Sequence, residues 1–200
     1  GIETHLVVLT DGSQGGATGD LVEVRRQEVR KAADLLGIAS LKTWSEPDRC
    51  LEPNSEIIAR ATELILEICP RTVFFPGPLE IHPDHRAACV LVWKALQKVK
   101  ISAPPPTPIS YEISVQNPIN MLIDITPQIE EKKRVMHTYI SQNAENNYPE
   151  LVVALDKGRT FSLPQEVKFA EGFFKYETKD LSLSMKDMLY TVIDLYGEKV

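Results

Sequence analysis

The sequence predicts an α/β fold in which a mostly parallel sheet is flanked by helices. Three strand-like runs, THLVVLT, SLKTW and TVFF, alternate with three segments that have helical hydrophobic periodicity. This alternation is typical of right-handed crossovers between parallel strands. The chain has 200 residues, 43% hydrophobic and 25% charged, which suits one domain with a substantial core. We therefore expect a single domain over residues 1–200.

The helix boundaries follow from capping signals. The first helix is predicted over residues 20–36, with Asp20 and Glu23 as a capping box and Gly37 as its C-cap. The next two are predicted over NSEIIARATELILEICP and residues 83–99, and the Pro-rich stretch APPPTP follows. ISYEISV and NMLIDIT predict two more strands. A helix over residues 127–141 is then expected to have Thr126 as its N-cap.

Composition excludes several classes of protein. The net charge of −6 argues against a nucleic-acid partner, because nucleic-acid binding usually needs a basic patch. No apolar run approaches the ~18 residues of a membrane span, and the start of the sequence has no signal-peptide pattern. Three cysteines without a C-x-x-C pair favour a reducing, cytoplasmic location. The glycine-rich segment DGSQGGATGD lacks a nucleotide-binding pattern and predicts a flexible loop at the sheet edge.

The segment EIHPDHRAACV places His82 and His85 on either side of Pro83 and Asp84. It lies between the strand TVFF and the next helix, at the carboxyl end of a strand, where open α/β sheets bind ligands. Residues three apart on a first helical turn reach the same region, and neutral imidazole is a common metal ligand. Helix capping, or a hydrogen-bonded histidine in the core, is the structural alternative.

The motifs together resemble the PIG-L/LmbE-like family of zinc-dependent N-acetylglucosaminyl deacetylases. LVVLTDG is similar to the second strand and Thr-Asp-Gly loop of the family, and RRQEVRKAADLLGI to its R-x-x-E helix. HPDHRAA is the most specific motif. IDIT, Lys132, Ser141-Gln142 and FAEGF are similar to later family segments in the same order. The resemblance runs over nearly the whole chain and implies a Rossmann-like sheet.

The resemblance implies a role for each matching residue. His85 would be a zinc ligand, although another divalent metal could replace zinc. His82 would stabilise the oxyanion or protonate the leaving amine, and Asp84 would hold it charged. Arg25, Asp48 and Asp11 would bind the substrate, while a solvated helix face and turn positions are the structural alternatives for these residues.

One family motif, Ala-His-Pro-Asp-Asp-Glu, is absent from the sequence. In the family it follows the first strand and supplies the other zinc ligands and the general base. We therefore expect this sequence to lack the first strand and helix of the fold. N-terminal truncation is the favoured explanation, because loss of a central strand would leave a large apolar surface exposed. Loss of the metal site is the alternative.

The expected activity is removal of an acetyl group from an N-acetylglucosamine-type conjugate, a small-molecule substrate whose aglycone the sequence leaves open. A non-catalytic binding protein on the same fold is the main alternative, and a metallohydrolase for another amide is a third hypothesis. Membrane association remains open if an upstream anchor was lost. A homo-oligomer also remains open, since Trp93 suits either a core or an interface.

Overall fold

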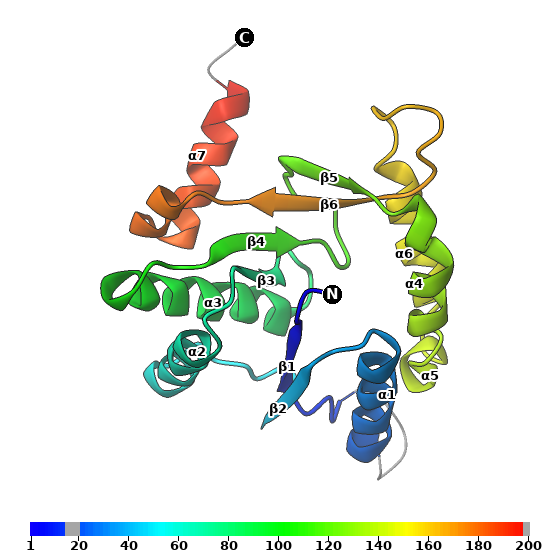
Figure 1. Cartoon of the computed structure of the whole chain (residues 1–200), viewed down its shortest axis with the longest axis horizontal. Helices are drawn as coiled ribbons and strands as arrows, with labels where there is room; N and C mark the ends of the chain where they lie inside the picture. Colours follow the sequence, from blue (N-terminus) through cyan, green and yellow to red (C-terminus); the bar gives the residue numbers. More distant parts are fainter. Residues whose placement is uncertain (15–20, 198–200) are drawn as a thin grey trace. The chain divides into compact units, whose positions relative to one another are not determined.

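The computed structural model describes residues 1–14 and 21–197, with side chains up to residue 194. The chain forms two compact units (Figure 1). The first unit comprises Gly1–Leu51 and Ile123–Glu171, and the second comprises Glu52–Leu122 and Gly172–Val200. Each unit is therefore built from two separate stretches of sequence. The single domain expected over residues 1–200 stays a prediction.

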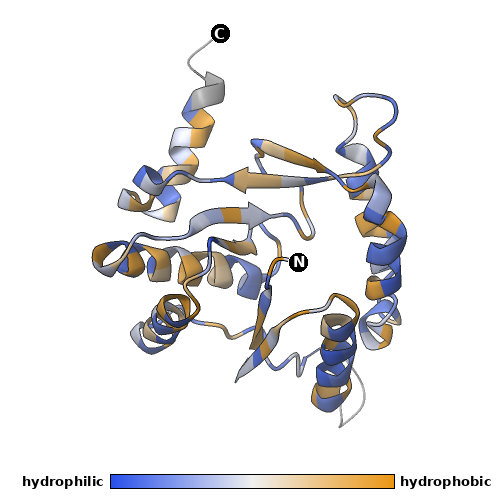
Figure 2. Cartoon of the chain, viewed as in Figure 1, coloured by the Kyte–Doolittle hydropathy of each residue, from blue (hydrophilic) through white to orange (hydrophobic). Residues whose placement is uncertain are grey.

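The first unit combines a parallel strand pair with helices from both of its stretches. Its elements are β1 (His5–Thr10), α1 (Leu21–Leu35), β2 (Ser40–Glu46), the 3₁₀ turn η1 (Thr126–Gln128), α4 (Ile129–Met136), α5 (Ile140–Asn143) and α6 (Tyr148–Gly158). In Figure 2, α1 is mostly blue, as expected for a helix that buries one narrow stripe. That buried stripe includes Ala32 and Ala33.

The second unit contains the long helix that follows the histidine motif. Its elements are α2 (Ser55–Ile68), β3 (Thr72–Pro76), α3 (Pro83–Ser102), β4 (Thr107–Tyr111), η2 (Thr178–Ser182) and α7 (Met185–Gly197). Two more strands, β5 (Met121–Asp124) and β6 (Ala170–Lys175), each run from one unit into the other along the sequence. Figure 1 shows α3 running alongside β3 and β4, with α2 beside it.

The strands confirm the predicted α/β class with mostly parallel pairing. β1 pairs with β2 and β3 pairs with β4, both in parallel, whereas β4 and β6 are antiparallel. The strands form two sheets, one of order β1-β2 and one of order β3-β4-β6-β5. Among the described residues, β1 and β3 each have a strand partner on one edge only.

A cluster of aromatic and aliphatic side chains forms the core of the second unit. Trp93 is 1% exposed, so it is a core residue of this unit, and its indole N–H donates to the carbonyl of Leu183 at 3.0 Å. The Trp93 ring packs edge-on against Tyr176, which stacks on Phe75. These contacts hold α3 against β3 and β6, so the start of α3 is fixed relative to the end of β3.

Local capping interactions define the start of α2 and the end of α1. Asn54 caps α2 by accepting hydrogen bonds from the backbone N–H groups of residues 56 and 57. Gly37 has a positive φ of 65°, and Ile38 donates to the carbonyl of Ala33, which is the expected Schellman-type end of α1. The predicted capping box at Asp20 and the rest of segment 15–20 lie outside the described residues.

The predicted helix over residues 127–141, capped by Thr126, is wrong in two respects. A 3₁₀ turn occupies 126–128, and α4 begins only at Ile129. The Thr126 hydroxyl instead accepts hydrogen bonds from the backbone N–H groups of Lys168 and Phe169. The helix then ends at Met136 and resumes as α5. The hydroxyl of buried Thr138 donates to the carbonyl of residue 135, a local bond that competes with continued helix.

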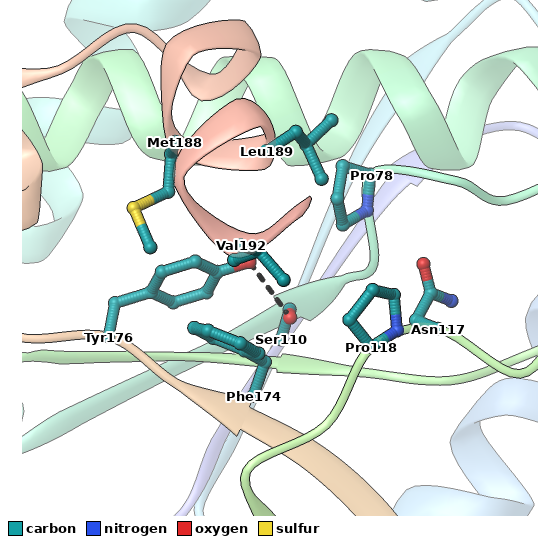
Figure 3. A pocket seen from close by; sticks show the side chains of 9 residues that line it. All are labelled: Pro78, Ser110, Asn117, Pro118, Phe174, Tyr176, Met188, Leu189 and Val192. Carbon is teal, nitrogen blue, oxygen red and sulfur yellow. Dashed lines mark hydrogen bonds between the residues drawn. The ribbon is translucent and has the colours of Figure 1, made fainter. Parts of the chain in front are cut away.

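A small hollow, partly open to solvent, lies in the second unit between α7, β4 and β6 (Figure 3). Its lining is largely apolar, and its two hydroxyl groups, on Ser110 and Tyr176, hydrogen-bond to each other at 3.2 Å. It therefore offers apolar surface and no reactive side chain. None of the helices in the described part of the chain is long and apolar enough to cross a membrane.

Candidate active site

The histidine motif lies at the carboxyl end of β3, as the sequence predicts. β3 ends at Pro76, and residues 77–82 lead into α3, whose first residue is Pro83. His82 has extended backbone geometry and is the N-cap of α3. Proline suits the first helical position because its missing N–H would have no helical partner there. The HPDH motif therefore folds locally as a helix start, and the two imidazole ring centroids are 4.9 Å apart.

The N-cap role of His82 fixes which ring nitrogen carries the proton. Its Nδ1 atom accepts a hydrogen bond from the backbone N–H of Asp84 at 3.2 Å. An accepting Nδ1 has no proton, so this bond requires the neutral ring with its proton on Nε2. Nε2 is then a hydrogen-bond donor. The expectation that Asp84 keeps His82 charged stays a prediction. The backbone N–H of Asp84 donates this hydrogen bond, and Asp84 itself is buried.

The Nδ1 atom of His85, unlike that of His82, accepts no backbone hydrogen bond from the described residues. The atom is buried and has no hydrogen-bond partner among the described residues, and Glu80 Oε2 lies 3.7 Å away. This separation is within ion-pair range but too long for a hydrogen bond. Burial and the neighbouring His82 lower the pKa of His85, against the opposing effect of the Glu80 carboxylate. The neutral form that metal binding requires is therefore favoured.

Glu80 is a buried carboxylate that the sequence analysis did not single out. Oε1 accepts from the backbone N–H of Ile113 at 2.9 Å and from the Asn117 side chain at 3.3 Å. Oε2 accepts from the backbone N–H and the hydroxyl of Ser114, at 3.0 and 2.6 Å. Burial alone would raise the pKa of Glu80, but the hydrogen bonds from Ser114 and Ile113 outweigh it and lower the pKa. Glu80 is thus held as a carboxylate anion.

Two other features shape the loop around Glu80. Gly77 lies so close to Asn117 that an added Cβ would be 2.7 Å from its side-chain nitrogen. Only glycine therefore leaves room for Asn117 to reach Glu80. The charge of Glu80 also contributes, after burial, to raising the pKa of Tyr111 to about 12. The negative charge at Glu80 thus favours the neutral form of the buried Tyr111 phenol.

The three residues expected to bind substrate cluster in the first unit. Asp11 Oδ1 accepts from the backbone N–H groups of Ser13 and Asp48 at 3.0 and 3.1 Å. Burial would raise the pKa of Asp11, but these hydrogen bonds outweigh burial and lower the pKa. Arg25 donates to the carbonyls of Gly12 and Gln14, and its guanidinium lies 3.7 Å from Asp48 Oδ2. This network braces the turn after β1.

The structure therefore places the predicted residues in two groups. His82, Asp84 and His85 lie in the second unit, whereas Asp11, Arg25 and Asp48 lie in the first. Members within each group are in contact. Sequence reasoning missed Glu80, and the available signal was weak: a single acidic residue two positions before the first histidine, between two apolar ones. Its importance comes from residues 113–117, which are distant in sequence.

The resemblance to the PIG-L family is confirmed. Residues 1–96 match the family model described as "PIG-L: GlcNAc-PI de-N-acetylase", a range that includes all six predicted site residues. A probable N-acetyl-alpha-D-glucosaminyl L-malate deacetylase 2 from Bacillus anthracis is 31% identical over 105 residues, 46% of each chain. The matched stretch therefore spans less than half the length of that relative.

Solved structures confirm the fold over most of the chain. The conserved protein TT1542 from Thermus thermophilus has a TM-score of 0.75 at 25% identity, over 89% of this chain and 83% of the other. The N,N'-diacetylchitobiose deacetylase from Pyrococcus horikoshii has a TM-score of 0.74 at 23% identity, over 94% and 78%. GalB, a 4-carboxy-2-hydroxymuconate hydratase from Pseudomonas putida, scores 0.71 at 18% identity, over 88% and 84%. The same fold therefore carries more than one chemistry.

Proposed function

We propose that the protein is a metal-dependent hydrolase that removes the acetyl group from an N-acetylated amino-sugar conjugate. The observation that carries the proposal is the pair of neighbouring histidines with opposite ring arrangements. His82 uses Nδ1 as an acceptor and so offers an Nε2–H donor. His85 turns Nδ1 toward a buried carboxylate and so offers an Nε2 lone pair. One hydrogen-bond donor and one lone pair at the end of a strand suit an oxyanion-stabilising role and a metal-ligand role, respectively.

His85 fits a zinc ligand by the chemistry of its surroundings. Ligating histidines usually direct their other ring nitrogen to a carboxylate or carbonyl, and the buried Nδ1 of His85 faces Glu80. A catalytic zinc ion needs about three protein ligands, and we propose His85 as one of them. When bound, zinc would polarise the acetyl carbonyl and lower the pKa of a bound water. Another divalent metal could supply the same chemistry.

His82 is proposed as the catalytic hydrogen-bond donor. Its Nε2–H would donate a hydrogen bond to the amide oxygen as negative charge develops there. Asp84 positions the ring, because its backbone N–H is held by His82 Nδ1. In the first unit, Arg25 and Asp11 would present the turn after β1, and Asp48 would contact substrate hydroxyls. These three assignments rest on the resemblance and on the bracing network described above.

The substrate class follows from the named relatives. The Bacillus anthracis relative is named for an N-acetylglucosaminyl malate and the Pyrococcus horikoshii structure for diacetylchitobiose. Both names describe an N-acetylated amino sugar joined to a second group. We propose that this protein acts on a small molecule of that kind, with the second group unassigned.

The main alternative is a binding protein without catalysis on the same fold. Because the fold is shared with a hydratase, the fold alone does not decide between these functions. The two hypotheses differ in one observable, the release of acetate. A binding protein would retain an acetylated amino sugar unchanged in the presence of zinc, whereas the proposed enzyme would release acetate from it.

The test measures zinc content and acetate release with N-acetylglucosaminyl malate and diacetylchitobiose. We expect about one zinc per chain and acetate release from at least one of these compounds. His85→Ala should lose the metal, whereas His137→Ala, an exposed histidine at the end of α4, should retain it. Unchanged metal content in His85→Ala would overturn the assignment.

A second variant separates the roles of the two histidines. Asparagine is a preferred N-cap, so His82→Asn keeps an acceptor for the Asp84 N–H but removes the Nε2–H donor. We expect this variant to bind zinc normally and to lose about 10²–10³-fold in kcat. Loss of zinc without a specific loss of kcat would show that His82 is a ligand and not the donor.

A further inference from the structure

We propose that Glu80 is the positioning residue of the active site: its buried carboxylate fixes the His85 ring with the proton on Nδ1 and leaves the Nε2 lone pair for a metal ion. The part of this inference that concerns the metal rests on the proposed function. The part that concerns the ring does not, because it describes the protein without metal.

The first step is the environment of His85 Nδ1. The atom is buried, and it makes no hydrogen bond to any residue that the structure describes. The acidic oxygen facing it is Glu80 Oε2 at 3.7 Å, on a side chain that is 0% exposed. A buried Nδ1 lone pair facing an anion would be repelled, whereas an Nδ1–H would be attracted. The carboxylate therefore selects the ring form that is protonated on Nδ1.

The second step is the rigidity of the carboxylate. Both oxygens of Glu80 accept two hydrogen bonds each, from the loop that follows β4. All four donors are N–H or O–H groups, so they match an acceptor-only anion. A glutamine at this position would turn an NH₂ group toward donors. The site is consequently built for a charged carboxylate and not for a neutral amide.

The third step is the backbone that carries Glu80. The Arg86 guanidinium reaches back from the first turn of α3 and donates to the carbonyls of Glu80 at 2.7 Å and Ile81. The neighbouring side chains of Leu79 and Ile81 are exposed, whereas Glu80 is 1% exposed. Side chains 79–81 therefore alternate between exposed and buried, and the buried acidic side chain points inward toward His85.

The consequence for metal binding follows from the distance. A shift of roughly 0.5–1 Å would bring His85 Nδ1 within hydrogen-bonding range of Glu80 Oε2. A carboxylate that accepts from a ligating imidazole fixes its orientation and raises its basicity, and losing such a partner costs about 10–100-fold in metal affinity. Glu80 would thus act on the metal through His85 and without touching it.

The experiment compares the full chain with Glu80→Gln and uses two measurements. Nitrogen-15 NMR of the imidazoles in metal-free protein reports which ring nitrogen of each histidine is protonated. Competition with a chromophoric chelator reports the affinity for zinc. Glu112→Gln is the matched control, because Glu112 accepts from the Asn117 backbone N–H at 2.6 Å in the same loop.

We expect wild-type His85 to be protonated on Nδ1 and His82 on Nε2. Glu80→Gln should shift the His85 proton toward Nε2 and weaken zinc binding by about 10–100-fold, whereas Glu112→Gln should change neither. Wild-type His85 protonated on Nε2 would overturn the inference even if Glu80→Gln failed to fold. Equal zinc affinity and an unchanged His85 tautomer in Glu80→Gln would also overturn it.

The outcomes also separate this inference from the proposed function. If wild-type protein binds no zinc and releases no acetate, but Glu80→Gln shifts the His85 proton, the role of Glu80 in positioning the ring stands and the proposed function fails. If wild-type protein is an active zinc enzyme and Glu80→Gln leaves tautomer and affinity unchanged, the function stands and the role of Glu80 fails.

Discussion

Glu28 joins two motif fragments that are 113 residues apart, and its removal gives a sharp test of how the first unit is held together. The carboxylate is 7% exposed and accepts from both the backbone N–H and the hydroxyl of Ser141, each at 2.7 Å. Ser141 is the second residue of α5, whose own N-cap residue makes no side-chain hydrogen bond. Glu28 therefore caps α5 from α1, in a position where a negative charge is favourable.

The expected loss in free energy of unfolding follows from the number of hydrogen bonds that each substitution removes. A hydrogen bond to a charged group contributes about 1.5–3 kcal/mol. Ser141→Ala removes one of the two bonds, so we expect about 1.5 kcal/mol lower free energy of unfolding. Glu28→Ala removes both bonds and leaves a backbone N–H of α5 without its partner, so about 3 kcal/mol is expected. The double variant should then be little worse than Glu28→Ala alone.

The assay is equilibrium unfolding in urea for the two single variants and the double variant. The two substitutions should couple by about 1–2 kcal/mol. Glu23→Gln, at an exposed position on the same helix, should change stability by less than about 0.5 kcal/mol. Single-variant effects that add to within about 0.5 kcal/mol in the double variant would refute the capping role.

Two further predictions concern buried groups in the two units. Lys132→Met leaves the buried Asp156 carboxylate without the ammonium that lies 2.7 Å away. A partly exposed pair should cost less than the roughly 3–5 kcal/mol of a fully buried one, so we expect about 2 kcal/mol in urea unfolding. Lys133→Met, whose partner on the same helix is exposed, should change it by less than about 0.5 kcal/mol. Equal effects would contradict this. In thiol titration two exposed cysteines should react quickly, Cys50 and Cys69. Burial raises the pKa of the Cys89 thiol to about 12, so this thiol should react only after the protein unfolds. Rapid reaction of all three thiols in folded protein would contradict the burial of Cys89.

Several expectations from the sequence depended on short-range signals, and these were confirmed. The C-cap at Gly37 and the helix start at Pro83 involve residues within a few positions of each other. The error at Thr126 has the opposite origin. Its hydroxyl bonds to backbone groups 42 and 43 residues away, and no local pattern predicts that these groups compete for it.

The amino-acid sequence by itself determined the α/β class, the alternation of the first three strands and helices, and the position of the histidine motif at the end of β3. Hydrophobic periodicity and capping chemistry act over a few residues, so they can be read along the chain. Only the tertiary structure decided that Glu80 faces His85 and is held by residues 113–117. Such contacts depend on how β3, β4 and α3 pack against one another. Packing brings together side chains that are distant in sequence, and no periodic pattern along the chain indicates which of them will meet.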